Sequence, residues 1–161
     1  MTRTFEGSFE GAHLRVAVVT SRFNEALVER LVDGAIDCLA RHGVPDEYIS
    51  MTWVPGAFEL PVAAKRIAAS GEVDAVVCVG AVVRGETPHF DFVAGAAAHG
   101  ITNAALETGV PITFGVLTTD DVDQASERAG GKMGNKGAEA ALAAIEMANL
   151  FAALPKPASE I

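Results

Sequence analysis

Short apolar runs rich in β-branched residues alternate along the chain with longer segments whose apolar positions recur at helical spacing. The runs that favour strands are residues 16–20, 49–54, 75–81 and 112–117. The segments that favour helices are residues 24–41, 60–69, 88–107, 122–128 and 138–154. Alternating strands and helices predict a parallel sheet with helices on both faces. Since the runs 16–19 and 76–79 are apolar throughout, they are expected at the centre of that sheet.

The first and last predicted helices have wider apolar surfaces than a single core contact requires. On the first, Leu27, Leu31, Ala35 and Leu39 recur at every fourth position, with a second apolar stripe beside them. On the last, apolar residues cover most of the circumference. We therefore expect contacts between subunits of an oligomer.

Residues 1–161 are expected to form one domain, preceded by an extended segment over residues 1–12 and ending in a frayed tail over residues 155–161. In the extended segment, Phe5 and Phe9 fall on one face. The segment either adds a strand to the sheet of a neighbouring subunit or lies over its own subunit. The pattern leaves both alternatives open.

Composition indicates a soluble protein, since half of the 161 residues are apolar, 20% are charged, and no apolar run approaches the ~18 residues of a membrane span. The start Met1–Phe5 has no apolar segment typical of a secretory signal, so a cytoplasmic protein is expected. A net charge of −9 argues against nucleic acid or an anionic membrane as partner. Cys38 and Cys78 lie in apolar patterns and are expected to be buried.

Ligands of open α/β sheets bind beyond the carboxyl ends of the strands, so the residues after each predicted strand are candidates for a site. Phe23 follows the first strand, either as a stacking platform or packed on its own helix, and Asn24 is suited to cap that helix. Gly56 and Ala57 follow the second strand and permit close approach of a ligand. Glu59 either favours the dipole of the next helix or accepts hydrogen bonds from polyol hydroxyls.

The run 80–92 (GAVVRGETPHFDF) carries the strongest chemical signal. Thr87 is suited to cap a helix and Pro88 to its first position, which leaves free N–H groups near residues 86–89 as an anion site. No P-loop or GxGxxG motif is present, so a single phosphate ester fits best. His89 would be kept neutral by the positive helix end and could relay protons, although a structural histidine is the alternative.

Two later features extend the candidate site. Phe114 lies in the fourth strand, and Arg128 has the planar fork that suits phosphate, or else is a solvated surface charge. The glycine-rich run 129–137 follows, which alternatively only connects two helices. Residue chemistry alone thus indicates an enzyme or binder of a phosphate ester with a candidate histidine.

Four motifs, in this order and spacing, resemble the lumazine synthase family from about residue 11 to residue 154. They are SRFN at 21–24, PGAFELP at 55–61, GAVVRGETPHFDF at 80–92, and ERAG at 127–130 with GNKG at 134–137. The resemblance implies a flavodoxin-like three-layer sandwich. It also implies condensation of 5-amino-6-(D-ribitylamino)uracil with 3,4-dihydroxy-2-butanone 4-phosphate to 6,7-dimethyl-8-ribityllumazine, the penultimate step of riboflavin biosynthesis, without a cofactor or metal.

The resemblance also implies roles for individual residues. His89 would transfer protons, and Lys136 is an additional candidate. The residues expected to bind the ribitylaminouracil are Phe23, which stacks on the ring, and Ala57, Phe58, Glu59, Ala81, Val82, Val83 and Phe114. Those expected to bind the butanone phosphate are Glu86, Thr87 and Arg128. In this family Phe114 and Arg128 would reach the site from an adjacent subunit.

Members of the family form pentamers, and the short connector 130–137 resembles members that assemble sixty subunits into a shell, with riboflavin synthase as a candidate cargo. Two alternative functions remain: an archaeal-type riboflavin synthase, and a catalytically weak shell that binds lumazine or flavin. A phospho-acceptor receiver domain is excluded, because the first strand ends in Thr20-Ser21-Arg22 without an acidic pair.

Overall fold

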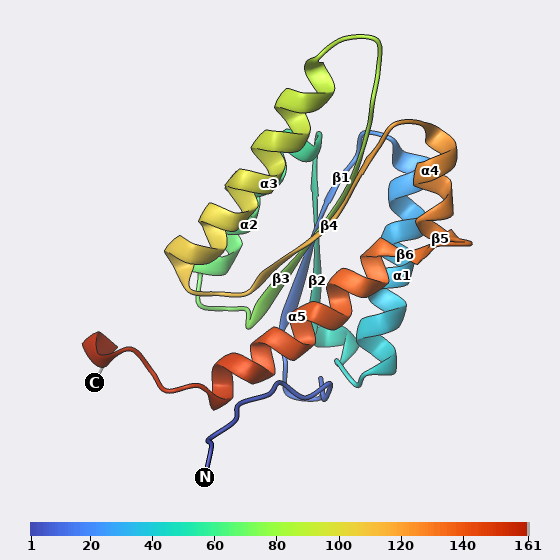
Figure 1. Ribbon diagram of the computed structural model, residues 1–161. Coiled ribbons are helices and arrows are strands. Elements are labelled where there is room, and N and C mark those ends of the chain that lie inside the picture. Colours follow the sequence, from blue (N-terminus) through green and yellow to red (C-terminus); the bar gives the residue numbers. More distant parts are fainter. Residues whose placement is uncertain (161) are drawn as a thin grey trace.

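Four parallel strands form the centre of the computed structural model, which describes residues 1–160. They are β1 (Val16–Ser21), β2 (Ile49–Val54), β3 (Ala75–Val83) and β4 (Ile112–Thr119), in the spatial order β2-β1-β3-β4. The chain moves outward from β1 to β2 and then crosses to β3, so the order reverses at β1. A ligand is expected at such a reversal, beyond the carboxyl ends of the strands at the top of Figure 1.

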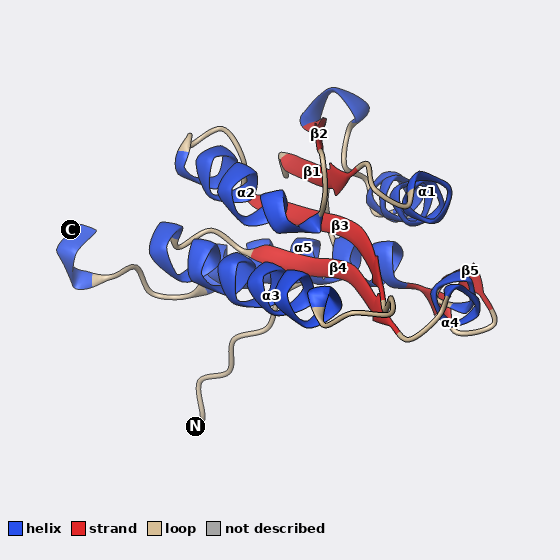
Figure 2. Ribbon diagram, turned by 90° about the horizontal axis from the view of Figure 1, so that it is seen from above, coloured by secondary structure: helices blue, strands red, loops and turns tan. Residues whose placement is uncertain are grey.

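Helices cover both faces of this sheet (Figures 1 and 2). One face carries α1 (Glu25–Arg41), α4 (Val122–Glu127) and α5 (Lys136–Ala153), and the other carries α2 (Leu60–Ala69) and α3 (His89–Thr108). The predicted three-layer α/β architecture is confirmed, with element ends within a few residues of those expected. Within residues 1–160, no helix combines the length and apolar character needed to cross a membrane.

The two central strands are buried on both sides, as their unbroken apolar runs predict. Val16, Val18, Val77 and Val79 pack in the cluster beneath α1 and α5, while the alternate positions pack beneath α2 and α3. Cys78 belongs to this second set, and burial raises the pKa of its thiol to about 12 because the thiolate would be desolvated. Both cysteines are buried and free.

The glycine-rich run after α4 forms a small antiparallel hairpin rather than a plain connector. Its strands are β5 (Ala129–Gly131) and β6 (Gly134–Asn135). Gly130 and Gly134 adopt positive φ angles of 95° and 84°, which L side chains rarely adopt. The hairpin fixes the segment that carries Arg128 and Lys136 between α4 and α5.

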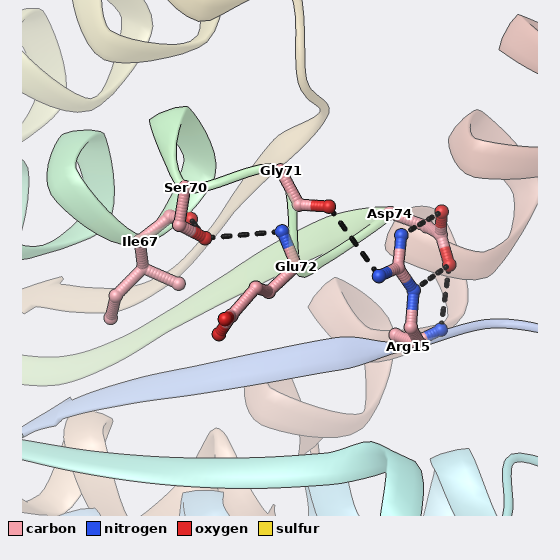
Figure 3. Close-up of polar contacts among 6 residues, drawn as sticks. All are labelled: Arg15, Ile67, Ser70, Gly71, Glu72 and Asp74. Carbon is pink, nitrogen blue, oxygen red and sulfur yellow. Dashed lines mark hydrogen bonds and ion pairs between the residues drawn. The ribbon is translucent and has the colours of Figure 1, made fainter.

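At the end of the sheet opposite the candidate site, polar contacts join the residue before β1 to the residue before β3 (Figure 3). The main-chain N–H of Arg15 donates to Asp74 Oδ2 at 2.8 Å, and the guanidinium pairs with Asp74 Oδ1 at 3.4 Å. The loop beside them is held by the Ser70 hydroxyl, which donates to the Ile67 carbonyl and accepts from the Glu72 N–H. These contacts fix the starts of β1 and β3, so their carboxyl ends are set in register.

The N-terminal segment lies along its own α5 in the single chain. The Asn149 side-chain amide donates to the carbonyls of Ser8 and Glu10, at 2.8 and 2.9 Å. Residues 1–15, all of which the structure describes, form no strand. The predicted frayed tail 155–161 includes a 3-10 turn over Ala158–Glu160 and ends at Ile161, which lies outside the described residues.

Gly137 illustrates how closely α5 approaches α1, and it yields a stability prediction. A Cβ at Gly137 would meet the main-chain carbonyl of Leu31, which cannot move independently of α1. We expect Gly137→Ala to lower the free energy of unfolding by about 1–3 kcal/mol, although alanine is intrinsically the better helix former. Urea unfolding would measure this. Glu139→Ala, at an exposed position of the same turn, is the control and should change stability little; an equally stable Gly137→Ala would contradict the packing argument.

Candidate active site

A pocket of about 730 Å³ opens at the carboxyl ends of the strands. It is lined by the loops after β1, β2 and β3 and by the first turns of α3. The pocket brings together many of the predicted site residues, which are Phe23, Ala57, Phe58, Glu59, Ala81, Val82, Val83, Thr87 and His89. The order reversal of the sheet therefore places three loops, distant in sequence, around one cavity.

Three aromatic side chains stand exposed in this pocket. The exposed fraction is 71% for Phe23, 62% for Phe58 and 73% for Phe92. Such exposure disfavours the alternative in which Phe23 packs on its own helix. An exposed ring at the edge of a pocket offers a flat apolar surface on which a planar heterocycle can stack.

Asn24 differs from its predicted role as a helix cap. It adopts the left-handed conformation, with φ of 62°, and its side chain makes no capping hydrogen bond. Instead its amide Nδ2 donates to the Ala81 carbonyl at 3.0 Å and ties the β1–α1 loop to β3. Asn24 also lines the pocket and was missed as a site residue, although asparagine's tolerance of this conformation was a usable signal.

Glu59 begins α2 from the end of the short 3-10 helix η2 (Ala57–Glu59). Its Oε2 accepts a hydrogen bond from the Gly56 N–H at 3.1 Å, which is the acidic half of a capping box; Gly56 has no side chain to form the other half. Glu59 thus contributes a hydrogen bond at the start of the helix. Because this bond uses only one carboxylate oxygen, binding of polyol hydroxyls by the other stays a prediction.

The loop from Arg84 to Pro88 carries the predicted anion site. α3 begins at His89, one residue later than expected, and the His89 N–H donates to the Thr87 hydroxyl at 3.4 Å. Within residues 1–160, the N–H groups of Gly85, Glu86 and Thr87 donate to no protein acceptor. Free donors beside the positive end of a 20-residue helix form an environment suited to an anion.

The pocket wall, as one chain forms it, contains no lysine or arginine among the described residues. Its ionisable side chains are Glu59 and His89. The helix end and the free N–H groups supply only partial positive charge, whereas a phosphate ester carries nearly two negative charges at neutral pH. A cation from outside this wall would complete a phosphate site.

Four predicted site residues do not line the pocket of the single chain. Three of these lie in β4 or follow it in the sequence. Phe114 is 39% exposed on β4, the edge strand opposite β2. Arg128 donates to the Gln124 carbonyl at 3.0 Å, and Lys136 pairs with Glu139 at 3.3 Å. The fourth, Glu86, lies exposed in the loop before α3.

Comparison with known proteins identifies similar sequences along most of the chain. The profile of a family described as 6,7-dimethyl-8-ribityllumazine synthase matches residues 13–152. A protein of Chlorobium phaeovibrioides named 6,7-dimethyl-8-ribityllumazine synthase is 56% identical over 149 residues, which cover 92% of this chain and 96% of that protein. Every predicted site residue lies within the region matched by the profile.

Proposed function

Since the chain belongs to the 6,7-dimethyl-8-ribityllumazine synthase family and is an enzyme of that type in riboflavin biosynthesis, we propose that the pocket at the carboxyl ends of its strands is where the condensation takes place. Its substrates are 5-amino-6-(D-ribitylamino)uracil and 3,4-dihydroxy-2-butanone 4-phosphate. One observation carries the proposal: exposed aromatic rings, His89 and a helix start with free N–H groups all lie around the same cavity.

The pyrimidine occupies the apolar side of the pocket. Its ring stacks on Phe23, and the residues expected to hold the ribityl chain and the ring edges are Ala57, Phe58, Glu59, Ala81, Val82 and Val83. The free oxygen of Glu59 accepts from a ribityl hydroxyl, while its other oxygen keeps the bond to Gly56. Stacking and hydrogen bonding together fix the amine that attacks the second substrate.

The butanone phosphate places its phosphate at the start of α3. The N–H groups near Glu86 and Thr87 donate to the phosphate oxygens, and Thr87 adds its hydroxyl. Arg128 of a neighbouring subunit supplies the missing positive charge, with Lys136 as an additional contributor, and Phe114 of that neighbour closes the pyrimidine side. The described wall of the single-chain pocket has no lysine or arginine, which supports a site shared between two subunits.

The chemistry requires mainly orientation and movement of protons. The pyrimidine amine and the ketone condense to an imine with loss of water, phosphate is eliminated, and ring closure with loss of a second water gives the lumazine. His89, at the first position of α3, transfers protons in these steps. The imidazole of His89 can accept a proton at one ring nitrogen and return it in a later step.

The assembly that we propose is a homopentamer with its sites between subunits, and twelve pentamers as a shell that encloses riboflavin synthase. Both outer strands of the sheet, β2 and β4, have an edge free of partners within residues 1–160. β2 exposes Met51 and Trp53, and β4 exposes Phe114. In the assembly, residues 4–10 of one subunit leave their own α5, where Asn149 holds them in the single chain, and add to the free edge of β2 in the next. Two free cysteines fit a reducing, cytoplasmic location.

Light scattering on the purified protein tests the assembly. A phosphate site that takes its cation from a neighbour requires stable contact between subunits, and the proposed pentamer implies a mass of at least five chains. A particle of about sixty chains would support the shell, following the closed symmetry of such oligomers. A monomer that is fully active would contradict the shared site.

Mixing both proposed substrates with the protein tests the function. We expect fluorescent lumazine and free phosphate to appear together in equal amounts. If neither appears, while lumazine still binds, the protein is a binding shell and not an active enzyme. If the protein instead converts added lumazine to riboflavin, it is a riboflavin synthase of the archaeal type.

A further inference from the structure

The loop that links β3 to α3 has few main-chain anchors of its own. At its start the Arg84 N–H donates to the Thr119 carbonyl at 2.8 Å, and at its end the Asp91 N–H donates to the Pro88 carbonyl at 3.0 Å. Between them, residues 85–88 are exposed, and an added Cβ at Gly85 would meet nothing within 4 Å. Something else must therefore hold the start of α3 against the sheet.

The Arg84 side chain makes three contacts that cross this loop. Its Nε donates to Asp120 Oδ1 at 3.0 Å, in the turn after β4. Its Nη1 pairs with Asp91 Oδ1 at 3.6 Å, in the first turn of α3. Its guanidinium carbon lies 4.3 Å from the centre of the Phe90 ring, a cation–π distance. One side chain thus joins the end of β4 to the start of α3.

Two of these contacts lie next to His89 in sequence. Phe90 follows His89 and, like it, lines the pocket, and its ring also packs against the core cluster beneath α2 and α3. Asp91 lies in the same turn. Because Arg84 holds the residues that follow His89, it restricts where the imidazole can lie over the pocket.

We propose that Arg84 is a positioning residue, which sets the place of His89 by clamping the first turn of α3 to the end of β4. The proposal rests on the proposed proton-transfer role of His89. A planar guanidinium is required, since it hydrogen-bonds one carboxylate and pairs with a second along its edge, while its face lies over a ring. Arg84 does not line the pocket and is not expected to touch either substrate, so it acts through the start of α3.

The clamp contributes to local order and little to the stability of the fold. The Arg84 side chain is 46% exposed, and its partners Asp91 and Asp120 are more exposed still. Exposed ion pairs are weak in isolation, so the fold should tolerate their loss. The expected consequence of losing Arg84 is therefore a less ordered start of α3 in a folded protein.

Hydrogen exchange tests the clamp without reference to catalysis. We expect amide exchange over residues 91–97 to rise about fivefold or more in Arg84→Ala, since weak tertiary contacts permit local opening. Arg15→Ala is the matched control, because Arg15 is 44% exposed and also pairs with an aspartate, at the opposite end of the sheet (Figure 3). Unchanged exchange in Arg84→Ala would overturn the proposal.

Kinetics test whether Arg84 acts through His89. We expect Arg84→Ala to lower kcat about tenfold in the otherwise native chain, but less than about twofold in a His89→Ala background, as coupled residues are not additive. A full tenfold loss in both backgrounds would overturn the proposal. If His89→Ala alone leaves kcat unchanged, the proposed function of His89 fails, while the exchange measurement still decides on the clamp.

Two further variants keep the test valid if Arg84→Ala does not fold. Arg84→Lys keeps one positive charge but loses the planar fork, so we expect intermediate exchange and an intermediate kcat. Asp120→Asn removes the acceptor charge at the end of β4 and should reproduce part of the loss. Native exchange and native kcat in both variants would overturn the proposal.

Discussion

Replacing His89 by alanine is expected to slow the condensation by about 10²- to 10⁴-fold, the usual contribution of one general acid or base, and to leave measurable turnover. In the proposed mechanism the imidazole moves protons, but the pocket also holds the two substrates together. Proximity and orientation can contribute ~7–11 kcal/mol to lowering the barrier, which is more than proton transfer by one side chain supplies. The substrate-holding residues around His89 are unchanged in this variant.

Initial rates of lumazine formation would measure this loss. The Michaelis constants for both substrates should change less than about threefold, because His89 acts on protons rather than on binding. His13→Ala, which changes an exposed histidine outside the pocket, is the control and should retain native kcat. A His89→Ala protein that is folded and completely inactive would contradict the view that positioning contributes most.

The central strands and the long helices were predictable because the local pattern of apolar residues indicates which of their positions are buried. β1 and β3 are apolar at successive positions, and this is typical only of strands covered on both faces. α1 carries its buried residues at helical spacing from Val28 to Leu39. Such elements depend on many residues, so a single unusual position does not obscure them.

The local geometry of the site was harder to predict because it depends on single residues and distant partners. The hairpin of β5 and β6 has too few residues for an alternating pattern. Asn24 bonds to a carbonyl 57 positions away, and Arg84 to a carboxylate 36 positions away. Tertiary contacts of this kind leave no periodic signal in the chain.

The sequence also could not divide the candidate site between subunits. Phe23 and Arg128 occur in one chain, and only the resemblance to a family assigned them to different subunits of one site. In the structure Phe23 lines the pocket, whereas Arg128 bonds to Gln124 and Glu127 outside it. That separation is what a shared site requires, and it makes the contribution of Arg128 testable.

Arg128→Ala is expected to raise the Michaelis constant for the butanone phosphate by about 10- to 100-fold, the effect of losing one or two hydrogen bonds to a charged group. The Michaelis constant for the pyrimidine should change little, since the residues proposed to hold that substrate are Phe23 and the loops after β2 and β3. Arg128→Lys should fall between, because a lysine keeps the charge without the fork. Arg15→Ala, at the far end of the sheet, should behave as the native protein.

Mixed assemblies distinguish a shared site from one formed within a single chain. Phe23→Asp places a charge where the pyrimidine stacks, at a position exposed enough to leave the fold intact. If the proposed pentamers assemble from equal amounts of Phe23→Asp and Arg128→Ala chains, about one quarter of the interfaces join an unaltered Phe23 to an unaltered Arg128 of the neighbour. At low substrate, where each variant alone is nearly inactive, the mixture should therefore recover about a quarter of the native rate. If Arg128 served the pocket of its own chain, every site would carry one defect and no mixing ratio would restore activity.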